Sequence, residues 1–299
     1  MDSEVQKRSQ LQKVQINGSL LKYASNELRN DREVVLTAVK QKGCALQYAS
    51  NELQNDREIV IAAVRQSGYA LQYASNELQN NRGVVLAAVG KYGWALGYAS
   101  NNLRNDREVV LAAVMQNGEA LEYASNELKT NREITLAAVT QTGYALFYAS
   151  NELRNDREVV FAAVTQTGRA LKYASNELRN DREVVLTAVT KTGYALLHAS
   201  NELRNDREVV LTAVTQNYGI LQYISQIFQN DVDFVLKVAQ IHSEINISPY
   251  TQHFKVFNNP EFIREAIYLP NIKNVKIDKC RVISTYLPST ILDLLYGLI

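Results

Sequence analysis

The sequence has little cysteine and almost no net charge, and each shortage excludes a class of protein. Cys44 and Cys280 are the only cysteines in 299 residues, so no disulfide framework or cysteine-rich zinc site is available, and a reducing, cytoplasmic location is expected. Lys+Arg number 32 against 31 Asp+Glu, and the resulting net charge of +1 removes the electrostatic basis for a nucleic-acid or anionic-membrane partner. The chain also lacks an apolar run of about 18 residues, so no membrane span is expected. With 46% hydrophobic residues it can still bury a core.

Proline is absent from most of the chain. All four prolines follow residue 245, at Pro249, Pro260, Pro270 and Pro288. A proline inside a helix removes a backbone hydrogen bond and clashes with the preceding turn, so a long proline-free stretch favours helices. The change in composition places a boundary near residue 246.

A tandem repeat fills the proline-free stretch. The string LKYASNELRNDREVVLTAV at Leu21 returns as LQYASNELQNDREIVIAAV at Leu46, and further copies follow every 25 residues. We therefore predict three regions. They are an N-terminal capping half-repeat (1–20), nine tandem repeats (21–245) and a C-terminal helical tail or cap (246–299).

One repeat contains the pattern of two helices. In its first half the small or apolar residues Ala45, Leu46, Ala49, Ser50 and Leu53 lie on one stripe of a helix. This pattern predicts a helix of roughly ten residues.

The second half of the repeat carries signals for a helix start and a helix end. Asn55 is a candidate N-cap, Glu58 completes a capping box, and Gly68 is a candidate left-handed residue that ends the helix. Isolated helices of about ten residues are marginal in water, so the repeats must stack on one another. The fold class we expect is all-α, a right-handed α-solenoid of about nine two-helix repeats of 25 residues with a small helical C-terminal cap.

The pattern ALxYASNELRNDREVVLxAVxxxG resembles an uncharacterised short α-helical repeat that occurs in tandem in intracellular bacteria, including Legionella-type effectors, and in some protists. It is also similar in length and layout to the leucine-rich variant repeat, although the prolines typical of that family are missing here. The resemblance covers about three-quarters of the chain. It supports the fold and implies no activity and no catalytic residue.

Two polar residue types recur in nearly every repeat. A tyrosine recurs from Tyr23 to Tyr223, with His198 in one copy, and an arginine recurs from Arg32 to Arg207 beside Asp or Asn. The arginines are either an anion-binding ridge or partners of the neighbouring carboxylates. We favour pairing with the carboxylates, because acidic residues recur close to each arginine in the sequence.

Variable positions are the better candidates for a binding site. The residue after the repeat glycine and the residue three places on differ between copies, and several are aromatic. Because Tyr, Trp and Arg dominate the energetics of protein interfaces, we expect a partner protein to bind there. The candidate partner-binding residues are Tyr69, Tyr92, Trp94, Glu119, Tyr144, Phe147, Arg169 and Tyr194.

The fourth repeat is the most irregular. Gly83, Gly90 and Gly97 lie outside the regular glycine positions and accompany Tyr92 and Trp94, the only tryptophan. Small residues beside a large aromatic predict a shallow pocket or a bend, and we expect Trp94 to anchor the partner there.

No catalytic, cofactor or metal motif is present. The chain lacks GxGxxG, P-loop, HExxH and GxSxG patterns, and no local signature supports a pair of Cys280 with His242 or His253. The predicted function is therefore a non-enzymatic scaffold that binds another protein, a host protein if the chain is a bacterial effector. The alternatives are an RNA-binding solenoid and an enzyme with an unrecognised site in the tail. The oligomeric state stays open.

Overall fold

The computed structural model describes residues 3–231, 233–234 and 237–238. The chain divides into two units, Met1–Ser175 and Asn176–Ile299, whose described residues are treated separately. All regular elements of the described residues are helical, so the prediction of an all-α solenoid of tandem repeats is confirmed. No helix in these residues is both long and apolar enough to span a membrane. The predicted C-terminal tail or cap lies outside the described residues.

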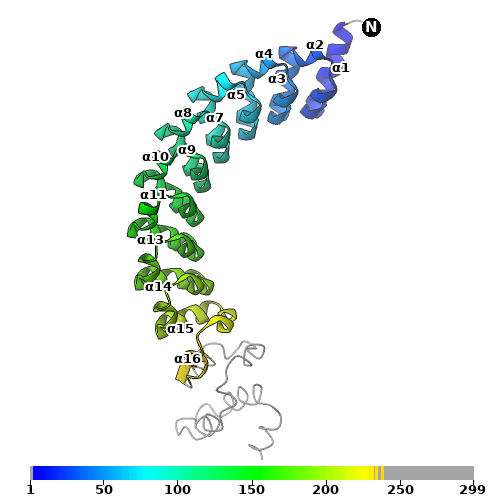
Figure 1. Ribbon diagram of the computed structural model, residues 1–299. Coiled ribbons are helices and arrows are strands. Elements are labelled where there is room, and N and C mark those ends of the chain that lie inside the picture. The colour runs from blue at the N-terminus through cyan, green and yellow to red at the C-terminus, as the bar shows by residue number, and fades with distance from the viewer. Residues whose placement is uncertain (1–2, 232, 235–236, 239–299) are drawn as a thin grey trace, which may run out of the picture. The chain divides into compact units, whose positions relative to one another are not determined.

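The unit Met1–Ser175 contains three kinds of helix that alternate along the chain (Figure 1). Its long helices are α1 (Ser3–Ile16), α3 (Arg32–Gln41), α5 (Arg57–Gln66), α7 (Arg82–Lys91), α9 (Arg107–Gln116), α11 (Arg132–Gln141) and α13 (Arg157–Gln166). Its 3-10 helices are η1 (Gly18–Tyr23), η2 (Gly43–Tyr48), η3 (Gly68–Tyr73), η4 (Gly93–Tyr98), η5 (Gly118–Tyr123), η6 (Gly143–Tyr148) and η7 (Gly168–Tyr173). Its short α-helices are α2 (Asn26–Arg29), α4 (Asn51–Gln54), α6 (Asn76–Gln79), α8 (Asn101–Arg104), α10 (Asn126–Lys129) and α12 (Asn151–Arg154).

The second unit continues the same order of elements. It contains η8 (Leu178–Asn180), α14 (Arg182–Lys191), η9 (Gly193–His198), η10 (Leu203–Asn205), α15 (Arg207–Gln216), η11 (Tyr218–Tyr223) and α16 (Gln226–Gln229). Here η8 and η10 take the place that a short α-helix holds in the other repeats.

Repeats pack in single file within the first unit. Each long helix contacts the long helix of the next repeat, and each 3-10 helix from η1 to η6 contacts the following one. The long helices form one layer and the short α-helices another (Figure 1). In α3 the side chains of Val34, Val35, Ala38 and Val39 are completely buried, and the same positions are buried in the later repeats, with Thr135 in place of one valine. The core is therefore a continuous file of small aliphatic side chains.

The first half of the repeat is helical but is not one helix. The 3-10 helix Gly43–Tyr48 ends at Ala49, whose backbone is extended, and Ser50 then caps the four-residue helix α4 by accepting a hydrogen bond from the Leu53 N–H. The backbone N–H of Ser50 donates to the carbonyl of Arg29 in the preceding repeat, at 3.0 Å, instead of within a helix. A bond between repeats thus replaces the bond that would have continued the helix, and the expectation of one ten-residue helix was wrong here.

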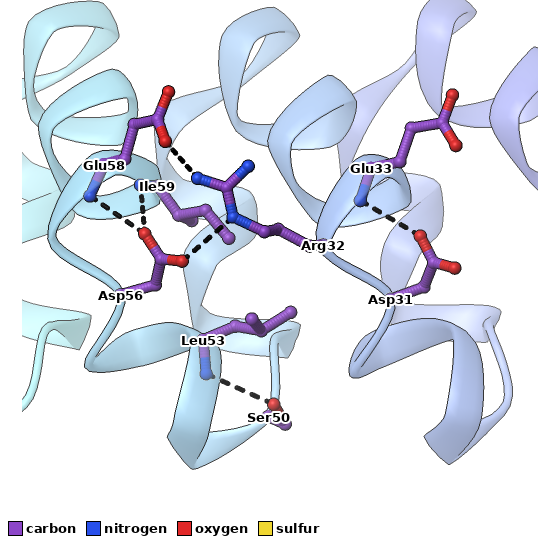
Figure 2. Close-up of polar contacts among 8 residues, drawn as sticks. All are labelled: Asp31, Arg32, Glu33, Ser50, Leu53, Asp56, Glu58 and Ile59. Atoms are coloured by element: carbon purple, nitrogen blue, oxygen red, sulfur yellow. Dashed lines mark hydrogen bonds and ion pairs between the residues drawn. The ribbon is translucent and has the colours of Figure 1, made fainter.

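The predicted cap of the long helix was also wrong. The N-cap of α5 is Asp56, which accepts from the backbone N–H groups of Glu58 and Ile59 (Figure 2). Asn55 instead ends α4. The side chain of Glu58 does not form a capping box, because it pairs with Arg32 of the preceding repeat.

The repeat glycine has a different role from the one predicted. No described residue has a positive φ angle, so Gly68 does not end α5 in a left-handed conformation. A Cβ atom added to Gly68 would lie 2.6 Å from the carbonyl oxygen of Ala88 and 2.8 Å from the Cβ of Tyr92. The glycine is needed because the next repeat approaches its Cα too closely for a side chain.

The N-terminal segment packs on the first complete repeat. Helix α1 packs against α3, as each long helix packs against its successor. Lys7 takes the place of the recurring arginine and pairs with Asp31 at 2.8 Å and with Glu33 at 2.9 Å. The first complete repeat therefore receives the same polar contacts as those that follow it.

Candidate protein interaction surface

The recurring arginines mainly join one repeat to the next. Arg132 contacts Asp156 at 2.8 Å and also pairs with Glu158. The Arg132 guanidinium is the largest influence on Asp156 and lowers the pKa of its carboxyl group. The same type of pairing is present for Arg32, Arg82, Arg107, Arg182 and Arg207. The structural interpretation is confirmed for these arginines, and they do not form a free anion-binding ridge.

Arg57 is an exception within the first unit. The next repeat carries Asn81 and Gly83 where the others carry an acidic residue at one or both positions. Arg57 forms no ion pair or hydrogen bond within the described part of the chain, and its guanidinium lies 3.5 Å from the position of a Cβ on Gly83. The irregular fourth repeat therefore lacks one inter-repeat ion pair.

A serine, a glutamate and the asparagine that ends the preceding short helix form a second inter-repeat contact, which we call the serine latch. Its hydroxyl-to-amide bond is present at Ser50, Ser75, Ser100 and Ser125. Ser50 donates its backbone N–H to Arg29 and its hydroxyl to the side-chain oxygen of Asn30. The amide of Asn30 donates to Glu52 at 3.1 Å. These polar residues are thus committed to stacking, and the surface available to a partner must be sought elsewhere.

The 3-10 helices carry the variable side chains. Residues three apart in a 3-10 helix lie on the same side, so the second and fifth residues of each segment point the same way. In η2 this proximity appears as a hydrogen bond from the side chain of Gln47 to the carbonyl of Cys44, at 2.9 Å. Tyr144 and Phe147 hold the two positions in η6 and are 38% and 51% exposed. The prediction that these positions share one exposed side is confirmed for η6.

We call the aromatic side chains that make ring contacts with one another in or directly beside η3 to η7 the aromatic face. Its members are Tyr69, Tyr92, Trp94, Tyr98, Tyr123, Tyr144, Phe147, Tyr148 and Tyr173.

The N-terminal part of the aromatic face centres on Tyr69. Its ring centroid lies 4.1 Å from that of Tyr92 and 6.4 Å from that of Tyr98. The hydroxyls of Tyr69 and Tyr92 are hydrogen bonded, and this bond is the main reason that the pKa of Tyr92 rises to about 12. Two of the predicted residues are thereby brought together.

The C-terminal part of the aromatic face centres on Phe147. Its ring lies 5.1 Å from Tyr148 and 5.0 Å from Tyr173, and Tyr144 lies 6.4 Å from Tyr173. Tyr173 therefore joins two predicted residues, Tyr144 and Phe147, of the preceding repeat. Such edge-to-face and tilted arrangements suit aromatic pairs and hold the rings in place.

An acidic repeat separates the two aromatic groups. Glu119 and Glu122 occupy the second and fifth positions of η5 and are half-buried. Partial burial, followed by the negative charge of Glu122, raises the pKa of Tyr148 to about 12. The Glu119 carboxylate forms no ion pair with any described residue, so its charge remains available to a partner.

In the fourth repeat the space beside Gly97 is filled by the next repeat. A Cβ on Gly97 would lie 3.1 Å from two ring carbons of Tyr123, so the ring of Tyr123 already covers this glycine. Trp94 is half-buried, and its ring lies 6.1 Å from that ring. Gly90 lies at an exposed position with no neighbouring atom within 4 Å. Trp94 is thus part of a packed pair, and no open space remains beside Gly97. The predicted pocket or bend of the fourth repeat stays a prediction.

Sequence reasoning named only some members of the surface. It listed Arg169, which is exposed on η7, and Tyr194, which lies on η9 in the second unit. It left the recurring tyrosines Tyr98, Tyr123 and Tyr173 out of the site. A signal exists for them, because Tyr69–Tyr98, Trp94–Tyr123 and Tyr144–Tyr173 are all separated by 29 residues, one repeat plus four.

The described residues hold no group of three or more His, Cys, Asp or Glu placed to bind a metal ion. Cys44 lies half-buried with its sulfur 3.9 Å from the hydroxyl of Ser67. His242, His253 and Cys280, which were considered for chemistry, lie outside the described residues.

Comparison with known proteins identifies the repeat. A family model described as a domain of unknown function, DUF4116, matches overlapping segments of about two repeats each. The matched residues are 10–54, 31–79, 81–129, 131–179, 156–204, 181–229 and 206–255. No match was found among curated proteins or among solved structures. Since the matches cover most of the chain, the protein belongs to the DUF4116 family of tandem repeats.

Proposed function

We propose that the protein is a non-enzymatic scaffold that binds another protein through the aromatic face of its 3-10 helices. The observation that carries the proposal is the row of exposed or half-exposed aromatic rings that stacking does not require. Phe147 and Tyr144 are 51% and 38% exposed, and Tyr69 is 39% exposed. Large aromatic side chains held in place by neighbouring rings are the typical anchors of protein interfaces.

Variation between the repeats supports the same proposal. The recurring arginines, serines and asparagines bond to neighbouring repeats, whereas the second and fifth residues of the 3-10 helices change from copy to copy. Residues that vary on a rigid, repeated framework provide specificity without disturbing the stack. Delivery into a host cell and a cytoplasmic location stay predictions.

The chain supplies its own test variants, because a residue found at the same position of another repeat should fit the framework. Tyr144→Glu copies Glu119, and Phe147→Gln copies Gln47 and Gln72. The matched control is Met115→Thr, which copies Thr140 and changes an exposed apolar residue of a long helix.

The experiment is affinity capture from a cell lysate with the wild type, the Tyr144→Glu/Phe147→Gln variant and the Met115→Thr control, read by quantitative mass spectrometry. A protein captured by the wild type and the control, and lost from the double variant, would support the proposal. Identical captured sets for all three proteins would contradict it. Salt-dependent binding to a random RNA pool that survives in the double variant would favour the alternative RNA-binding function.

A further inference from the structure

We propose that the aromatic face binds a proline-rich segment in the polyproline II conformation, with a basic residue opposite Glu119. This inference rests on the proposed function and names the class of partner that the surface fits. It is argued from the spacing of the repeats, from the hydroxyl groups of the tyrosines and from the charge of η5.

The packing of the 3-10 helices favours a ligand with a period of three residues, because consecutive helices from η3 to η6 contact one another. Equivalent positions of adjacent packed helices lie about 8–10 Å apart. A polyproline II helix rises about 3.1 Å per residue with three residues per turn, so every third side chain returns to the same side after about 9.3 Å. A β-strand presents one face every two residues, or about 6.7 Å, which does not match the stack.

The polar atoms of the face suit the same ligand. A polyproline II helix has no internal hydrogen bonds, so its carbonyl groups are free acceptors. The aromatic face offers rings that pack against proline and hydroxyl groups that donate to carbonyls. Tyrosine hydroxyls keep their protons at neutral pH, because their ordinary pKa is about 10. Within the hydrogen-bonded pair of Tyr69 and Tyr92 one hydroxyl proton is used and the other remains able to donate to the ligand, whereas the Tyr148 hydroxyl already bonds to Glu122.

The negative charge of η5 determines which ligand residue lies opposite each repeat. Successive repeats present Tyr69, Trp94, Glu119 and Tyr144 at the second position of η3 to η6. Because the Glu119 carboxylate forms no ion pair with a described residue, a lysine or arginine of the ligand would complement it. The expected ligand is therefore a ten-residue segment with proline at positions 1, 4 and 10 and a basic residue at position 7.

The test measures binding of fluorescein-labelled decapeptides to the full-length protein by fluorescence anisotropy. The first peptide carries arginine at the seventh position and proline elsewhere, and the second carries arginine at the fourth position to cover the opposite chain direction. A third carries glutamate in place of the arginine of the tighter binder. The protein variants are Tyr144→Glu/Phe147→Gln, Glu119→Arg and the control Met115→Thr, each first checked for an unchanged circular dichroism spectrum.

We expect one arginine peptide to bind, the double variant to weaken it about tenfold or more, and Met115→Thr to leave it unchanged. Glu119→Arg, which copies Arg169, should weaken the arginine peptide about tenfold and strengthen the glutamate peptide by a similar factor. Failure of both arginine peptides to bind, or binding that the double variant leaves unchanged, would overturn the inference.

A random peptide library displayed on phage separates this failure from failure of the proposed function. Selected peptides without proline that lose binding to the double variant would overturn the polyproline inference and retain the protein-binding face. Selection of no peptide that depends on Tyr144 and Phe147 would count against both.

Discussion

The close contact between repeats at Gly68 can be tested with two identical substitutions that should have opposite effects. In Gly68→Ala the new Cβ would lie 2.6 Å from the carbonyl oxygen of Ala88, a backbone atom that cannot rotate away. In Gly90→Ala the new methyl group meets nothing within 4 Å, and the residue lies near the end of α7.

The magnitudes follow from these environments. Carbon atoms essentially never approach an oxygen closer than 3.0 Å, so Gly68→Ala must separate two repeats by several tenths of an ångström along a packed interface. Overpacking of this kind typically costs about 1–3 kcal/mol, and we expect a loss of about 2 kcal/mol in the free energy of unfolding. Gly90→Ala should gain about 0.5–1 kcal/mol, because alanine loses less backbone entropy in a helix.

The measurement is urea unfolding followed by circular dichroism at equal protein concentration. The unfolding midpoint should fall for Gly68→Ala and rise for Gly90→Ala relative to the wild type. Equal midpoints for all three proteins would refute the close approach at Gly68, and so would a larger loss for Gly90→Ala.

Three further predictions concern contacts inside the stack. Gln66→Ala removes the side-chain oxygen that accepts from the backbone N–H of Gly43 at 2.6 Å, so the unfolding free energy should fall by about 1–2 kcal/mol in urea titrations, and an unchanged midpoint would contradict this bond. Thr135→Val replaces a fully buried hydroxyl, which donates a long hydrogen bond of 3.4 Å to the carbonyl of Lys129, by the valine that other repeats carry at this position. The melting temperature should rise by a few degrees, and a fall would contradict the prediction. Acid should destabilise the array, because the pKa of Asp156 is lower in the folded state. Its stabilisation is complete above the unfolded value of about 3.9 and is lost as the pH falls through the folded pKa, so a flat unfolding midpoint between about pH 5 and pH 2 would contradict the prediction.

The period of the sequence predicted the fold because every repeat buries the same apolar positions. Ile59 and its counterpart Val84 in the next repeat are both completely buried, so the stack follows from the periodicity alone. The break within the first half of the repeat was not predicted. Ser75 has the size of a core residue in the apolar stripe, yet it caps α6 and donates its backbone N–H to Gln54 in the preceding repeat. The pattern within one repeat cannot predict this contact, because Gln54 belongs to the preceding repeat.

Variation between the repeats predicted part of the candidate surface. Variable positions identified Tyr144 and Phe147, whose shared exposed side follows from their spacing of three. The contribution of Tyr173 was missed, because it reaches the surface only when the next repeat places its ring against Phe147. The candidate surface combines constant residues of one repeat with variable residues of another, and only the packing of the two repeats reveals such a pair.

The serine latch repeats one kind of junction along the first unit. Ser125 meets Asn105 through the same hydroxyl-to-amide bond by which Ser75 meets Asn55, although the surrounding variable residues differ. Ser150 lacks this partner, because Thr130 takes the place of the asparagine. Duplicating or deleting a 25-residue stretch between two latched junctions would therefore reproduce the same kind of junction, and we expect the array to fold with one repeat more or fewer.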